Sequence, residues 1–235
     1  MIYLTYSRSL GEEEKRRFSK VGAEIKSVEL YFPELAHEEI CIYFYSKDSI
    51  RGAPAEFIPL DHPQYNSRIK HINNPTKYSI VFSKWMTSCD NRIERILIIS
   101  HEFQHVFQYI GHKKGYLYAC ILRDYGDDGH GMAVQTIPSE KDADRKSKDI
   151  LAKMFGEEGV REFVNDLISS ENLKDRNFAD YFDSLNMEEE YDFVNEVNKL
   201  WDKKAMNSVI EGMKKSPTRL QNLILQNHNF AEEVI

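Results

Sequence analysis

The sequence predicts an α+β fold, in which a small mixed β-sheet packs on a central helix and a mainly helical region follows. Three observations support this prediction. Runs rich in β-branched and aromatic residues occur before Gly156, two helices with clear end signals lie mid-chain, and the sequence after Gly156 is almost wholly helical in pattern. We therefore expect a mixed domain over residues 1–156 and a helical, acidic subdomain over residues 157–235.

Four segments before Gly156 have the composition of β-strands. They are Ile2–Tyr6, Ser27–Phe32, Ile40–Tyr45 and Lys77–Trp85. The intervening segment 51–77 holds four of the seven prolines, so we expect mostly irregular connection there.

Two helices have recognisable ends. Asn91, followed three residues later by a glutamate, has the spacing of a capping box, and Gly111 comes after the last periodic residue, which predicts a helix from Asn91 to Ile110. Pro138 and the serine after it start a second helix in a similar way, and Gly156 is placed to stop it.

The composition is that of an ordinary globular protein. Apolar residues make up 41% and charged residues 29% of the 235 residues, which excludes a disordered or collagen-like chain. The net charge is −7, and the excess negative charge lies in residues 151–235. Because this balance repels phosphates, we expect no nucleic-acid binding.

Several features bear on the compartment. The longest apolar run, Tyr116–Leu122, is far shorter than the roughly 18 residues that a bilayer-spanning helix needs. The amino terminus has no basic leader followed by an apolar segment. Cys41, Cys89 and Cys120 are odd in number and lack metal-site spacing, which argues against a disulfide framework. We expect no membrane association and a cytoplasmic location.

The predicted helix from Asn91 contains the pattern His-Glu-x-x-His, as His101-Glu102-Phe103-Gln104-His105. Side chains at positions i and i+4 lie on one face of a helix, so the two imidazoles can reach a single zinc ion. Glu102 sits one residue round the helix, within reach of a water molecule at such an ion. It is therefore the natural general base.

A catalytic zinc site usually has three protein ligands, and the second helix offers the third. Glu140 and Asp144 lie four residues apart, with Ala143 and Ser147 beside them as small residues that permit close helix packing. One carboxylate can bind the metal while the other, Asp144, accepts the second ring N–H of a metal-bound histidine. The metzincin extension is excluded, because it requires a glycine where Gln108 stands.

With these residues in place, HEFQH followed by EKDAD resembles the gluzincin branch of the zincin metallopeptidases over about residues 77–156. The resemblance implies a zincin-like fold for residues 1–156. It also implies that His101, His105 and Glu140 hold Zn²⁺, that Glu102 is the base, and that Asp144 supports a ligand.

Two assignments stay open at this point. Asp142 and His130 compete with Glu140 as third ligand, because a long glycine-containing stretch separates the two motifs. The group that steadies the developing oxyanion is also undecided. The candidates are Tyr116, Tyr118, Tyr125, His112 and His130, and we favour His130 in this catalytic role.

The function expected from this site is zinc-dependent hydrolysis of a peptide or protein substrate, with Lys77–Trp85 as an edge strand along which an extended peptide pairs. One alternative is a catalytically inactive zinc protein that binds or regulates a partner. Another is a helical interaction protein in which the histidine pattern is accidental.

Overall fold

The computed structural model describes residues 2–7, 10–47, 53–59, 77–125 and 136–200. The strands are β1 (Ile2–Tyr6), β2 (Ile40–Phe44), β3 (Ala55–Pro59) and β4 (Tyr78–Phe82). The helices are α1 (Glu12–Glu29), the 3₁₀ turn η1 (Pro33–Leu35), α3 (Trp85–Ser88), α4 (Arg92–Gly111), α5 (Lys113–Tyr125), α6 (Pro138–Ile168), α7 (Leu173–Asp183) and α8 (Phe193–Leu200). A mixed sheet combined with helices agrees with the prediction at this level.

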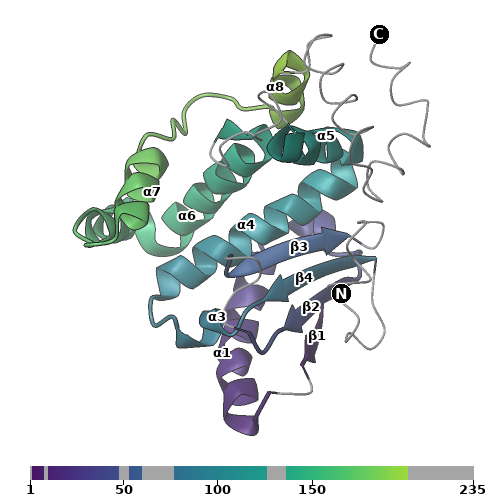
Figure 1. The fold of residues 1–235 in the computed structure, drawn as a ribbon, viewed down its shortest axis with the longest axis vertical. Helices are drawn as coiled ribbons and strands as arrows, with labels where there is room; N and C mark the ends of the chain where they lie inside the picture. Colours follow the sequence, from purple (N-terminus) through teal and green to yellow (C-terminus); the bar gives the residue numbers. More distant parts are fainter. Residues whose placement is uncertain (1, 8–9, 48–52, 60–76, 126–135, 201–235) are drawn as a thin grey trace.

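The four strands form one sheet in the order β1-β2-β4-β3 (Figure 1). β1 and β4 both run parallel to β2, whereas β3 pairs antiparallel to β4 with Phe57 opposite Ile80. The order places β4 between two neighbours. The expectation that Lys77–Trp85 forms an edge is therefore wrong, since among the described strands the edge next to β4 is β3.

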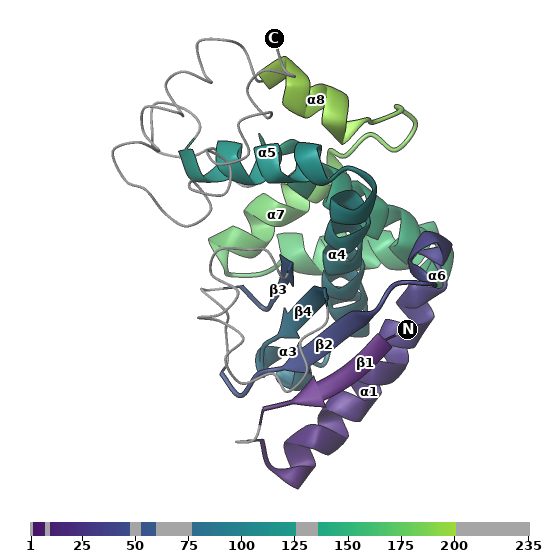
Figure 2. The ribbon, with the colours of Figure 1, turned by 90° about the vertical axis from the view of Figure 1, so that its right-hand side faces the viewer.

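The main core lies between one face of the sheet and helices α1 and α4, which Figure 2 shows on the same side. Side chains of β2 alternate between the two faces, as the strand period of two requires. Ile40, Ile42 and Phe44 join the main core, while Cys41 and Tyr43 belong to a second apolar cluster on the opposite face. The inner strands are therefore buried on both sides, as is typical of parallel pairing.

The expected strand Ser27–Phe32 is wrong, because these residues belong to the end of α1 and the turn after it. Phe18, Val21, Ile25 and Val28 are all buried and recur with the helical period, so α1 lays one continuous apolar stripe on the sheet. That packing outweighs the local β preference of the segment.

The segment 51–77, for which the prolines predicted mostly irregular connection, contains the strand β3. β3 ends at Pro59, and Phe57 packs its ring 5.7 Å from that of Tyr109 on α4. A proline is tolerated at the end of an edge strand, where its missing N–H breaks no central ladder. The end of the expected strand Lys77–Trp85 also needs correction, since β4 stops at Phe82 and Trp85 opens α3.

Both predicted mid-chain helices are present. The Asn91 side chain caps α4, with Oδ1 accepting from the N–H groups of Ile93 at 2.9 Å and Glu94 at 3.3 Å. α6 begins at Pro138, and Gly156 interrupts its helical path with a φ of +77°. A further helical stretch continues directly from the glycine to Ile168, so Gly156 makes a kink where we expected an end.

The described part of residues 157–200 is mainly helical, as predicted, and residues 173–200 contact α6. The Lys148 ammonium donates to the carbonyl oxygens of Phe182 at 2.8 Å and Asp183 at 3.1 Å, at the carboxyl end of α7. The Arg145 guanidinium donates to the carbonyls of Asn186 and Glu189. The division into residues 1–156 and 157–235 stays a prediction.

The membrane prediction can be compared with the helices of the described part of the chain. None of them combines the length and the apolar character that crossing a membrane requires.

Candidate metal centre

Helix α4 presents the two histidines of the motif on one face. Phe103 and Val106 are fully buried in the core, and they fix the rotation of the helix about its axis. The rings of His101 and His105 then lie next to each other in an edge-to-face arrangement, with centroids 4.6 Å apart. Because Phe103 and Val106 face the core, the side of α4 that carries the histidines faces α6.

Helix α6 crosses α4 closely and brings Glu140 to the histidines. Ala143 and Ser147 are fully buried where the two helices meet, in agreement with the small-residue contact that the sequence predicts. Because these side chains are short, the carboxylate on the first turn of α6 reaches the imidazoles of α4.

Three side-chain atoms converge in a geometry that suits a metal ion. The Nε2 atoms of His101 and His105 lie 3.0 Å apart, and Glu140 Oε2 lies 3.1 Å from the first and 3.4 Å from the second. Ligands held tetrahedrally at about 2.0–2.2 Å from zinc are roughly 3.3–3.5 Å from each other, so only small adjustments are needed. Among the described residues, no other group of His, Cys, Asp and Glu side chains converges in this way.

Asp144 lies where the sequence predicts a supporting carboxylate. Its Oδ1 is 2.9 Å from Nδ1 of His101. A carboxylate accepts a hydrogen bond from this nitrogen, so the Nδ1–H points to Asp144 and Nε2 is the atom available to a metal.

Asp142, a rival for the third-ligand position, points to a different set of partners. Its Oδ2 accepts from Nε2 of Gln104 at 2.6 Å and from Nε2 of Gln108 at 2.7 Å. The other end of the Gln108 amide, Oε1, lies 2.9 Å from Nδ1 of His105. Asp142 is thus engaged by two amides, while Glu140 faces the histidines.

Sequence reasoning missed these two glutamines. They recur four residues apart on α4, like the histidines, and each follows its histidine by three positions. That spacing was the available signal, because it places the amides on the face already assigned to the site.

The charges in the site favour an ion pair in the metal-free protein. Burial disfavours the charged form of His101, but the carboxylates of Asp144 and Glu140 outweigh it and hold the His101 pKa well above its usual value. Burial likewise disfavours the charged form of Glu140, but His105 and His101 keep the pKa of its carboxyl well below the usual value. A positive imidazolium therefore faces a carboxylate where a cation would bind.

Glu102 is buried beside the two histidines. Burial raises the pKa of its carboxyl; the histidines act in the opposite direction, and the negative charges of Glu140 and Glu56 add to the increase. A glutamate with a raised pKa is suited to accept and return a proton near neutral pH.

The candidates for oxyanion stabilisation differ in their burial and in their position relative to the histidines. Tyr116 is buried, and its ring centroid lies 5.6 Å from that of His105. His112 is exposed and packs against Phe193. Tyr118 is buried on α5. The Tyr125 side chain and His130 lie outside the described residues, so the preference for His130 is left as a prediction.

Helix α7 adds a residue that the sequence did not single out. The Tyr181 hydroxyl is buried, and its pKa is raised by burial and by the negative charge of Asp144. The helical region after Gly156 therefore lies against the carboxylate that supports His101.

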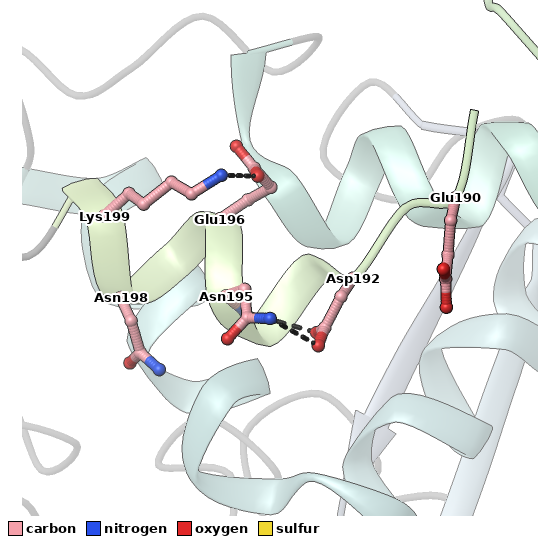
Figure 3. Close-up of a pocket in the computed structure, with 6 residues that line it drawn as sticks. All are labelled: Glu190, Asp192, Asn195, Glu196, Asn198 and Lys199. Atoms are coloured by element: carbon pink, nitrogen blue, oxygen red, sulfur yellow. Dashed lines mark hydrogen bonds and ion pairs between the residues drawn. The ribbon is translucent and has the colours of Figure 1, made fainter.

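A hollow of about 640 Å³ lies beside α8, and its lining does not resemble a metal site (Figure 3). Asp192 Oδ2 accepts from the side-chain amide of Asn195 at 2.9 Å, and Lys199 pairs with Glu196 at 2.5 Å. None of its lining residues is a histidine or a cysteine. These contacts are those of a capped surface helix.

Comparison with protein-family models, with curated proteins and with solved structures finds no match to this chain.

Proposed function

We propose that this protein is a zinc-dependent peptidase with a zincin-like arrangement around α4. The observation that carries the proposal is the convergence of His101, His105 and Glu140, with the buried Glu102 adjacent to them. Two nitrogen ligands and one carboxylate are a donor set found in catalytic zinc sites, which keep one position open.

Zinc held there would supply Lewis-acid activation of both the water and the scissile carbonyl. Glu102 takes the proton of the attacking water and later delivers it to the leaving amine, because its raised pKa lets it serve in both directions. Asp144 keeps the His101 ring in one orientation throughout the cycle.

The substrate is best accommodated along β3. Among the described strands, β3 lies at one edge of the sheet and pairs antiparallel with β4. It packs on α4, and the negative charge of its Glu56 contributes to the raised pKa of Glu102. An extended peptide can pair with such an edge through backbone hydrogen bonds, which positions a peptide bond near the base.

Substitution of Glu102 by glutamine tests the base directly. We expect the variant to retain zinc and to lose at least about 100-fold in hydrolysis of a mixed peptide library, because a neutral amide cannot accept the proton. Zinc content by mass spectrometry and cleavage by peptide sequencing provide the two measurements.

The matched control is Glu94→Gln, the same change on the same helix near its amino-terminal end, away from the histidines. It should keep both zinc and activity. A fully active Glu102→Gln variant would refute the assigned base. Stoichiometric zinc without any turnover would favour the inactive zinc protein, and absence of zinc after chelator-free purification would favour the accidental motif.

A further inference from the structure

Gln108 connects both metal-bearing helices through a side chain that is fully buried. Its Nε2 lies 2.9 Å from the Ser139 carbonyl oxygen and 2.7 Å from Asp142 Oδ2, both on α6. Its Oε1 lies 2.9 Å from His105 Nδ1 on α4. All three contacts are within hydrogen-bond distance, so neither end of the amide is idle.

These partners permit only one orientation of the amide. The Ser139 carbonyl and the Asp142 carboxylate can only accept hydrogen bonds, so the NH₂ group of Gln108 must face them. The amide oxygen must then face His105. A flipped amide would place an oxygen against two acceptors and an NH₂ group against the ring nitrogen.

The orientation of the amide in turn determines the tautomer of His105. An amide oxygen accepts a hydrogen bond, so Nδ1 of His105 carries a proton, and whenever the ring is neutral its lone pair is on Nε2. That nitrogen is the one that lies 3.0 Å from His101 Nε2 and 3.4 Å from Glu140 Oε2. Gln108 therefore does for His105 what Asp144 does for His101, but with a neutral acceptor.

We propose that Gln108 is a positioning residue of the metal centre, which holds His105 in its metal-binding tautomer and transmits the polarity of Ser139 and Asp142 to that ring. The inference rests on the proposed metal site. It assigns a function to the polar contact between α4 and α6 beyond helix packing.

The test compares Gln108→Met with Gln104→Met. Both changes remove an amide that donates to Asp142, but only Gln108 contacts a histidine. In the metal-free protein, long-range ¹H–¹⁵N correlation should show His105 protonated at Nδ1 in the wild type and in Gln104→Met, and a mixture of tautomers in Gln108→Met. Zinc affinity should fall about 10–100-fold in Gln108→Met and change little in the control.

An unchanged tautomer and an unchanged zinc affinity in a folded Gln108→Met variant would overturn the inference. If that variant fails to fold, Gln108→Asn decides, because it keeps the amide but is one methylene too short to bridge the helices. Absence of zinc binding by the wild type would instead contradict the proposed function. The tautomer measurement needs no metal, so the two failures are distinguishable.

Discussion

At single residues of the site, burial and ion pairing have opposite effects on the charge of the side chain. Burial alone would keep His101 and Glu140 neutral, yet Asp144 and Glu140 favour the charged form of His101, and His105 and His101 favour the charged form of Glu140. In the metal-free protein, His101 therefore carries a proton on each ring nitrogen, with Nδ1 donating to Asp144 and Nε2 directed at Glu140. A metal ion must displace the proton on Nε2.

This proton makes zinc affinity depend on pH. Below the raised pKa of His101, binding releases one proton, so affinity should increase by up to about tenfold per pH unit and level off above that pKa. Isothermal titration calorimetry in two buffers of different ionisation enthalpy counts the protons released. Equal affinity at pH 6.5 and 7.5, with no proton release, would contradict the charge state assigned to His101.

The identities of the site residues were partly predictable. The i, i+4 spacing indicated His101 and His105 from local geometry alone, and the resemblance to gluzincins suggested Glu140. The choice between Glu140 and Asp142 was not predictable, because it depends on which carboxylate of α6 faces α4.

At the scale of elements, the signals that start a helix were reliable, whereas composition misassigned one segment and Gly156 did not end its helix. The Asn91 cap and the proline at the start of α6 predicted the two helices that carry the site, since they satisfy or remove backbone donors locally. A capping box would also need the Glu94 carboxylate to accept from the Asn91 backbone N–H. Instead, this carboxylate accepts from the Cys89 thiol at 3.3 Å. Composition misassigned Ser27–Phe32, where tertiary packing of α1 decided the outcome.

The Asn91 cap can be tested separately from the chemistry. Substitution by alanine leaves two N–H groups of α4 without their acceptor and should lower the free energy of unfolding by about 1 kcal/mol. Zinc affinity should be unchanged, because His101 lies nearly three turns further along the helix. Urea denaturation provides the measurement, and Asn91→Asp, which keeps an acceptor, should restore stability. Equal stability of the alanine variant and the wild type would rule out this role for the cap.

At the scale of the whole molecule, the site is formed by residues of two helices, α4 and α6, whose relative position is set by packing in the core. α4 is fixed by the sheet through Phe103 and Val106, whereas α6 is supported by contacts of Arg145 and Lys148 with the segments around α7 and α8. A metal ion bound by both helices would therefore stabilise the packing of α6 against α4.

Metal removal should reveal this coupling as a change in thermal stability. Zinc at 100 times its Kd contributes about 2.7 kcal/mol by mass action, which for a chain of this size raises the Tm by roughly 5–10 °C. Differential scanning calorimetry before and after chelation measures the shift. Glu102→Gln should keep the shift and His105→Ala should lose it. An unchanged Tm of the zinc-loaded wild type after chelation would exclude a metal bridge.

The sequence by itself determined the features that depend on neighbours along the chain. The helical period placed His101 and His105 on one face, the cap and proline signals placed both site helices, and β-branched and aromatic composition identified three of the strands. The tertiary structure decided everything that depends on the approach of distant segments: β3 as the edge, Glu140 rather than Asp142 beside the histidines, and Gln108 between α4 and α6. The physical reason is that hydrogen bonds and ligand geometry are sensitive to differences of less than an ångström, and only the packing of the core sets distances that finely between segments over thirty residues apart.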